Sequence, residues 1–162
     1  MALAVKEQKY KIRKAYKKDA EAIYQLVKKA FVNYNKQGNT PVTDEKLADV
    51  YQDIIHNIVL VIENNNKIIG TLRLQFAEEK SCYLKRFSID PDYQDQGLGT
   101  MLYLKSEQLA FAEGKEYIYL YSTVEKENLI NFYNKLGFIC LKTDCSNGYQ
   151  RGLWIKKLDG VD

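Results

Sequence analysis

The chain has 162 residues and a mass of 18.8 kDa, with 46% hydrophobic and 28% charged residues, which suits one folded domain and excludes a disordered or collagen-like chain. No apolar run approaches the roughly 18 residues that a membrane-spanning helix needs, so we expect no membrane partner. The formal net charge of +3 hides an excess of basic residues at the beginning of the chain. These basic residues are interleaved with Tyr10, Ile12 and Ala15, as in a strand that leads into a helix, so we expect no nucleic-acid partner.

The first half of the chain predicts one strand, two helices and three more strands. The first strand covers Tyr10–Ala15. Apolar side chains then recur at helical spacing in two stripes: Ile23, Leu26, Val27, Ala30, Phe31 and Tyr34, and Leu47, Val50, Tyr51, Ile54 and Ile55. Asp19 is the expected N-cap of the first helix, and Thr43 or Asp44 that of the second. Three strands follow, with turn residues Asn64–Asn66 between the first two: Ile58–Glu63, Lys67–Phe76 and Cys82–Ile89.

The second half alternates helices and strands. A helix is expected over Leu98–Ala112, a strand over Tyr117–Ser122 and a short helix over Asn128–Leu136. Two strands, Phe138–Lys142 and Leu153–Leu158, complete the chain. The order β-α-α-β-β-β-α-β-α-β-β predicts a single-domain mixed α/β sheet whose early strands form hairpins.

The cysteines and the single histidine have no spacing typical of a zinc site, so we expect no metal. Cys82 and Cys140 lie in strand patterns and are expected to be small core residues, whereas Cys145 lies in a turn and is expected to be exposed. His56, at a helix end, is expected on the surface. The first residues lack the apolar stretch of a secretory signal, which favours reduced thiols and a cytoplasmic location.

The stretch from Phe87 to Thr100 reads Phe-Ser-Ile-Asp-Pro-Asp-Tyr-Gln-Asp-Gln-Gly-Leu-Gly-Thr. It predicts a strand, a proline-bounded turn and a glycine-containing loop that opens a helix. Free amides at a helix start favour an anion, and Gly97 and Gly99 lack the Cβ atoms that would keep a diphosphate away from the main chain. The spacing is neither that of a P-loop nor GxGxxG, so it disfavours both of those phosphate sites.

A second segment, from Asn128 to Phe138, follows after one predicted strand. Together, Gln94-x-x-Gly97-x-Gly99 and Asn128…Phe132-Tyr133-x-Lys135-Leu136-Gly137-Phe138 resemble the two signature segments of the GNAT acetyltransferases. The predicted element order also resembles that family. The resemblance therefore covers nearly the whole chain, and we expect one GNAT-like domain over residues 9–158.

The resemblance implies a site for acetyl-CoA as co-substrate. The main chain of the strand before the loop would bind the pantetheine arm, at Phe87, Ser88 and Ile89. The amides of the loop would hold the diphosphate, at Gln94, Asp95, Gln96, Gly97, Leu98, Gly99 and Thr100. Asn128 would also bind the pantetheine and Lys135 the adenosine phosphates, and Tyr133 would protonate the leaving thiolate as a general acid.

The implied activity is that of an acyltransferase in which a primary amine, on a small molecule or a protein, attacks the thioester directly. Many family members carry a carboxylate on or near the strand before the loop as a base, but Cys82–Ile89 contains only Lys85 and Arg86 as charges. Glu78, Glu79 and Glu125 lie near strand ends without a clear role, so the base stays unassigned. The missing carboxylate keeps open a non-catalytic CoA-binding or regulatory module, and a homodimer is also open.

Some of these residues also have structural explanations. Tyr133 continues an apolar helical stripe, so it could be a core residue. Acidic residues recur every four positions in one stretch, with Asp44 alongside: Glu45, Asp49 and Asp53. This pattern favours a solvated helix face over a surface that attracts a cationic amine. Tyrosines alternate along one predicted strand and could line a pocket or simply pack on the sheet: Tyr117, Tyr119 and Tyr121.

Overall fold

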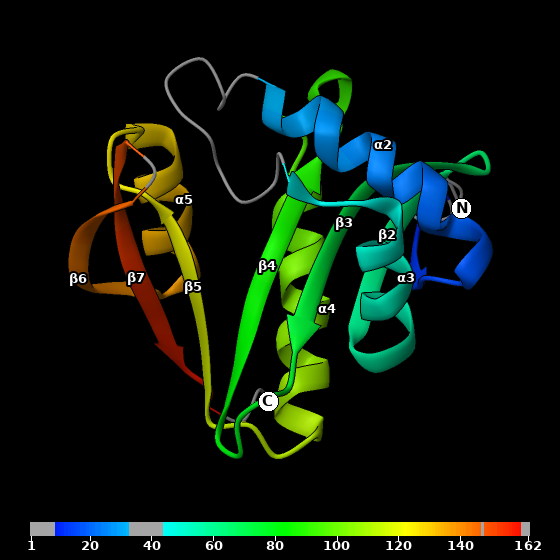
Figure 1. The fold of residues 1–162 in the computed structure, drawn as a ribbon. Coiled ribbons are helices and arrows are strands. Elements are labelled where there is room, and N and C mark those ends of the chain that lie inside the picture. Colours follow the sequence, from blue (N-terminus) through cyan, green and yellow to red (C-terminus); the bar gives the residue numbers. More distant parts are fainter. Residues whose placement is uncertain (1–8, 33–43, 147, 160–162) are drawn as a thin grey trace, which may run out of the picture.

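A computed structural model describes residues 9–32, 44–146 and 148–159 of the chain. Its centre is a seven-stranded sheet with the strand order β1-β2-β3-β4-β5-β7-β6 (Figure 1). The strands are β1 (Tyr10–Lys14), β2 (Ile58–Asn64), β3 (Lys67–Gln75), β4 (Ser81–Ile89), β5 (Tyr117–Thr123), β6 (Ile139–Ser146) and β7 (Tyr149–Lys157). All neighbours are antiparallel except β4 and β5, which are parallel.

Helices cover both faces of this sheet. They are α2 (Ala20–Phe31), α3 (Leu47–His56), α4 (Leu98–Ala112) and α5 (Glu127–Leu136), with short 3₁₀ turns η1 (Lys17–Asp19) and η4 (Pro91–Tyr93). Figure 1 shows α2 and α3 on the near side of β2–β4 and α4 on the far side. No helix within the described residues is both long and apolar enough to cross a membrane. The predicted order of strands and helices and the mixed α/β class are confirmed.

The apolar pattern of β2 explains the two-sided packing. Val59 and Val61 are buried against α2 and α3, whereas Leu60 and Ile62 belong to the larger core that includes α4. Because neighbouring residues of a strand point to opposite faces, a continuous apolar run of this kind needs cover on both sides. The Asn-rich turn after β2 is also as expected, since Asn65 and Asn66 have φ values of +50° and +67°.

The helix starts differ from the prediction. Asp19 stands at the N-cap position of α2, but its carboxylate binds Arg13 and the amide of Tyr16 instead of the helix amides. The first residue of α3 is Leu47, so Asp44 does not cap it. Thr43, the other predicted cap, lies outside the described residues. A capping pattern in the sequence does not reveal that an arginine of a strand, here Arg13 of β1, binds the carboxylate instead.

The parallel pair β4 and β5 separates soon after it begins. Only Ser81–Tyr83 of β4 pairs with Tyr117–Tyr119 of β5. Beyond Tyr83, β4 continues along β3 to Ile89, but no strand among the described residues pairs with its other edge. A bulge in β4 bends it at this point, where Arg86 has a φ of +53°. Figure 1 shows the two halves of the sheet diverging from here.

Candidate functional site

The free edge of β4 holds the three residues predicted to bind through their main chain. Ser88 is buried, and Phe87 and Ile89 are half-buried. Ile89 pairs with Gly70 of β3 on the closed side. Its carbonyl oxygen accepts a hydrogen bond from Nε2 of Gln94 at 3.3 Å, so this loop side chain turns back onto the strand. The opposite edge can accept an extended chain by main-chain hydrogen bonds, as an exposed strand does.

The loop after β4 ends in an uncapped helix start. Gly97 is the N-cap of α4, with a φ of +77° that a residue bearing a Cβ atom adopts only with strain, and no side chain caps the helix. The amides of Leu98, Gly99 and Thr100 donate to no acceptor within the described residues. A Cβ atom on Gly97 would meet nothing within 4 Å. The first turn of α4 therefore presents free donors beside open space, the arrangement that suits a phosphate group.

Gly99 has a different role from Gly97. A Cβ atom there would lie 3.4 Å from the ring of Phe132 and 3.7 Å from that of Phe87, whose centroids are themselves 5.8 Å apart. The small residue thus lets α4 approach both β4 and α5. The structure brings together three segments that are predicted to form one site: the strand β4, the loop after it and the helix α5, which carries Tyr133.

A substitution at Gly97 tests the anion site. Asn and Asp have the same shape and are among the non-glycine residues found most often at positive φ, so Gly97→Asn and Gly97→Asp share the same backbone strain and differ mainly in charge. We expect Gly97→Asp to bind CoA about tenfold or more weakly than Gly97→Asn, because its carboxylate repels the diphosphate. Isothermal titration with CoA measures both dissociation constants. Equal affinities of the two variants would show that no anion binds beside Gly97.

Asp90 fixes the turn between β4 and this loop. It is 3% exposed, and its carboxylate accepts hydrogen bonds from the amide of Asp92 at 2.9 Å and from Nζ of Lys29 in α2 at 3.0 Å. Burial raises the pKa of Asp90, but these two donors outweigh burial and leave the pKa below its usual value. No local sequence pattern predicts the contact with Lys29, which lies 61 positions away.

Asp90→Asn is expected to lower the free energy of unfolding by about 1 kcal/mol at pH 7, because Asn keeps an acceptor for Asp92 but loses the charge. Since the pKa of Asp90 is depressed in the folded protein, the wild-type advantage is complete well above pH 4 and disappears as the pH falls through the folded pKa. Urea unfolding at several pH values measures it. A difference between wild type and variant that grows on acidification would contradict this assignment.

Tyr133 lies on the buried side of α5. It is 8% exposed, and its ring packs against Phe132, Phe138 and Trp154 at centroid distances of 5.2, 5.8 and 6.2 Å. The residues that follow explain part of the motif. Gly137 ends the helix with a φ of +100°, and the amide of Phe138 donates to the carbonyl of Tyr133 at 3.0 Å. Tyr133 therefore has the core contacts expected from its stripe, and its role as an acid stays a prediction.

The remaining predicted residues are distributed around the loop. Leu98 is buried and anchors α4, whereas Asp95 and Thr100 are exposed. The side-chain oxygen of Gln96 accepts a hydrogen bond from the hydroxyl of Tyr10 at 3.0 Å. Two further residues, Asn128 and Lys135, are exposed on α5. No hydrogen bond or ion pair within the described part of the chain joins either of them to the loop, so their roles stay predictions.

The expectation of a solvated acidic face was wrong. Glu45 lies before α3 and is 8% exposed, as is Asp53. Glu45 accepts hydrogen bonds from both Nη atoms of Arg73, a fully buried residue of β3, and Asp53 binds Arg73 at 3.0 Å. Of the predicted stripe, only Asp49 is exposed; its carboxylate accepts the amide of Lys46.

The cysteines and His56 offer no chemistry to this site. Cys82 is buried as expected, and burial raises the pKa of its thiol to about 12. Cys140 was expected in the core but is exposed, as Cys145 is, and His56 is exposed at the end of α3. Within the described ranges, no three His, Cys, Asp or Glu side chains form a group that could hold a metal ion.

Comparison with known proteins agrees with this geometry. Residues 20–138 match the Acetyltransferase (GNAT) family. An uncharacterized N-acetyltransferase of Methanocaldococcus jannaschii is 26% identical over 139 residues, which are 80% of this chain and 60% of that protein. The match thus spans less than two thirds of that relative's length.

Two solved structures have the same fold. The PaiA N-acetyltransferase of Thermoplasma acidophilum in complex with coenzyme A superposes with a TM-score of 0.77 at 19% identity, covering 91% of this chain and 98% of that one. The putative acetyltransferase YncA of Salmonella typhimurium with acetyl-CoA gives a TM-score of 0.74 at 20% identity, covering 94% and 96%. With the family match over most of the sequence and this fold around the described site, the chain belongs to the GNAT family of acetyltransferases.

Proposed function

We propose that this chain transfers the acetyl group of acetyl-CoA to a primary amine, through one domain over residues 9–158. The observation that carries the proposal is the free edge of β4, which leads directly into the uncapped start of α4 beside the open space at Gly97. The PaiA and YncA structures contain coenzyme A and acetyl-CoA, which supports the same co-substrate here. No step of this reaction needs a metal ion.

The described residues fit the co-substrate part by part. The pantetheine arm is extended and carries amides, so it would hydrogen-bond to the main chain at Phe87–Ile89 along the free edge. The diphosphate would accept hydrogen bonds from the amides in the first turn of α4, where the helix dipole adds to the attraction. Asn128 and Lys135 would bind the pantetheine and the adenosine phosphates, respectively, from α5.

The chemistry is a direct transfer. The amine nitrogen attacks the thioester carbonyl carbon, a C–N bond forms, and the C–S bond breaks as the tetrahedral intermediate collapses. A main-chain amide of β4 would stabilise the oxyanion, and the Tyr133 hydroxyl would give its proton to the departing sulfur. The attacking nitrogen must lose a proton to solvent or to a base.

No base is assigned from the described residues. Glu78 is bound by the hydroxyls of Tyr119 and Ser81 at 2.7 and 2.8 Å, at the end where β4 and β5 are still paired. Glu125 accepts the amide of Gln150 at 3.3 Å and is exposed. Glu45 and Asp53 are each bound to cations. The acceptor is therefore expected to react as the free amine, with kcat/KM rising with pH up to the pKa of the acceptor itself.

The ion pairs that Glu45 and Asp53 each form with neighbouring cations favour the alternative function. A chain that keeps the diphosphate loop but has no carboxylate free to take a proton could bind CoA as a regulatory module without turnover. The three free cysteines fit a reducing compartment such as the cytoplasm under either function, and a homodimer stays a prediction.

An acceptor screen separates the two functions. Acetyl-CoA is incubated with the protein and a panel of amines, free CoA is followed with a thiol reagent, and CoA binding is measured by titration calorimetry. The transferase predicts CoA release that depends on both protein and amine. Tight CoA binding without release for any amine would contradict turnover and support the binding module, and the absence of CoA binding would exclude both.

A further inference from the structure

Two arginines near the divergence of β4 and β5 use only part of their hydrogen-bonding capacity. The Nε atom of Arg86, at the bulge of β4, binds Glu45 at 3.3 Å, and the Nε atom of Arg151, on β7, binds Asp144 at 2.8 Å. Their Nη atoms have no hydrogen-bond partner within the described residues. The two side chains are 19% and 27% exposed. Each keeps the planar pair of donors that binds a carboxylate or phosphate bidentately.

Arg73 shows the contrasting arrangement of a structural arginine. It is fully buried, both of its Nη atoms bind carboxylates, and its Nε atom is the one without a partner. In Arg86 and Arg151 the Nε atom is bound to a carboxylate, and the terminal Nη atoms are the donors that have no partner within the described residues.

The nearby carboxylates cannot attract a cation. Glu45 is shared by Arg73 and Arg86, and Asp53 is shared by Arg73 and Lys85, with Nζ of Lys85 at 3.3 Å. Three cations therefore surround two carboxylates in this cluster. Asp44, next to Glu45 in the sequence, is exposed and forms no ion pair with a described residue, so it could favour a cationic ligand.

Three tyrosines form one cluster across β4 and β5. Tyr83 of β4 stacks on Tyr119 of β5 at 5.2 Å and meets Tyr121 edge-on at 6.0 Å. Arg151 lies over the Tyr121 ring at 4.3 Å. Burial raises the pKa of Tyr83, while the positive charges of both Arg86 and Arg151 act in the opposite direction. Arg151 therefore contacts this cluster from β7, whereas Arg86 lies on β4, the strand that carries Tyr83, so the two arginines come from opposite halves of the sheet.

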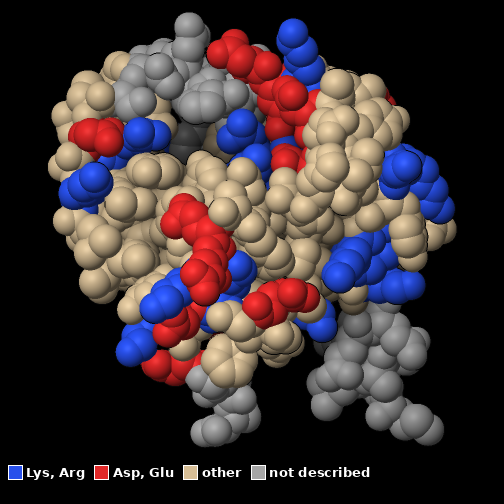
Figure 2. Space-filling model, turned by 60° about the horizontal axis from the view of Figure 1, so that its bottom comes forward, with Lys and Arg blue, Asp and Glu red and all other residues tan. Residues whose placement is uncertain are grey.

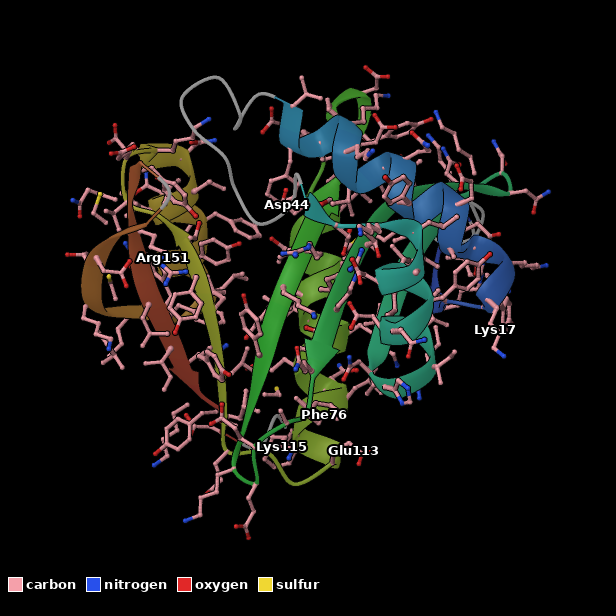
Figure 3. All side chains as sticks on the ribbon, viewed as in Figure 1. Lys17, Asp44, Phe76, Glu113, Lys115 and Arg151 are labelled. Atoms are coloured by element: carbon pink, nitrogen blue, oxygen red, sulfur yellow. The ribbon has the colours of Figure 1, made fainter. Side chains whose placement is uncertain are left out.

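The pictures agree with this arrangement. Figure 3 shows Arg151 on the side of β5 and β7, and Asp44 beside β4, on opposite sides of the diverging strands. Figure 2 shows a hollow in the surface that has basic atoms on two sides and acidic atoms near it. Tyr83 alternates along β4 with Cys82 and Leu84, which belong to the core that includes α4, so its side chain lies on the opposite face of the sheet.

We propose that the acceptor is a small primary amine that also carries a carboxylate or phosphate, and that Arg86 and Arg151 bind this anionic group. The inference rests on the proposed acetyl transfer and adds the chemical class of its acceptor. Binding of the anion would leave the amine toward β4, and the tyrosine rings would exclude water around the carbon skeleton.

Acceptor pairs that differ only in the anionic group test this proposal. L-Alanine is compared with L-alaninamide, and glucosamine 6-phosphate with glucosamine. The pH of each assay is chosen so that the same fraction of the amine is unprotonated in both members of a pair. Spermidine serves as the cationic acceptor. At least one anionic member is expected to exceed its neutral partner in kcat/KM by tenfold or more, and the better of the two pairs identifies carboxylate or phosphate.

Three variants connect the preference to the residues. Arg86→Gln and Arg151→Gln are each expected to lower kcat/KM for the anionic acceptor by tenfold or more, and to change that for its neutral partner by less than twofold. Lys17→Gln, which removes a positive charge on the far side of the molecule in Figure 3, is the matched control and is expected to change neither. Because Arg151 is outside the Arg73 cluster, its variant keeps the test valid if Arg86→Gln unfolds.

The possible outcomes distinguish the anionic acceptor from acetyl transfer itself. A higher kcat/KM for spermidine or for the neutral members would overturn the anionic acceptor and leave acetyl transfer intact. The same holds if the arginine variants lower kcat/KM equally for both members of a pair. A loss of activity in Asp44→Asn that is confined to spermidine would assign this face to cations and overturn the proposal. CoA binding without turnover of any amine would overturn both claims.

Discussion

Tyr133→Phe is expected to lower kcat by about 10²–10⁴-fold and to leave KM for acetyl-CoA nearly unchanged, because the hydroxyl is needed when the C–S bond breaks and not for binding. Phe preserves the ring contacts with Phe132, Phe138 and Trp154, so the core should be intact. Steady-state kinetics at saturating acceptor measures the effect.

Tyr103→Phe provides the matched control. Tyr103 is a fully buried tyrosine of α4 that also packs on Phe138, and its hydroxyl has no hydrogen-bond partner within the described residues. Removal of that hydroxyl is expected to leave kcat unchanged. A similar fall in both variants would point to disturbed packing around Phe138, and an unchanged kcat in Tyr133→Phe would return Tyr133 to the core alone.

Arg73→Met is expected to lower the free energy of unfolding by about 3 kcal/mol, because it leaves Glu45 and Asp53 buried with less compensation. Lys85 and Arg86 each still pair with one of the two carboxylates, which limits the loss. Urea or thermal unfolding followed by circular dichroism measures the change.

Two comparisons identify the cause of that loss. Lys80 and Glu116 form an ion pair at 3.8 Å whose side chains are 73% and 54% exposed, so Lys80→Met is expected to cost less than about 1 kcal/mol. Addition of Glu45→Gln and Asp53→Asn to Arg73→Met removes both buried carboxylates and should recover part of the stability, because the cations that then lose their partners, Lys85 and Arg86, are each 19% exposed and keep contact with water. An equal loss in Arg73→Met and Lys80→Met would mean that burial of the cluster is not important.

The fold could be predicted from the sequence because its signals are local. The period of the apolar residues identified α2 and α3, the asparagines at positions 65 and 66 predicted the hairpin turn, and Gly137 marked the end of α5. Prediction failed where distant segments compete for a side chain. The carboxylate of Asp19, expected to cap α2, is instead bound by Arg13 of the first strand.

The candidate site divides in the same way. The uncapped start of α4 at Gly97 was predictable because its conformation depends on the glycine and the main chain, and its role in binding stays a prediction. The ion-pair cluster was not, since Arg73 is 28 residues from Glu45 and 20 from Asp53, and the spacing of the acids alone resembled a solvated helix face. Likewise, the sequence contains Arg86 and Arg151 as ordinary charges, and only the sheet places Arg151 of β7 beside the tyrosine rings of β4 and β5.

A single-turnover reaction with isotopically labelled acetyl-CoA tests direct transfer to an amine most directly. The protein is mixed with one equivalent of labelled acetyl-CoA and an acceptor that supports CoA release, and the products are analysed by mass spectrometry during and after the turnover. Direct attack predicts label on the acceptor nitrogen at every time point, with the protein mass unchanged. Label that appears first on the protein and then moves to the acceptor would contradict direct attack, and hydrolysis to labelled acetate without acetylated amine would contradict the transfer itself.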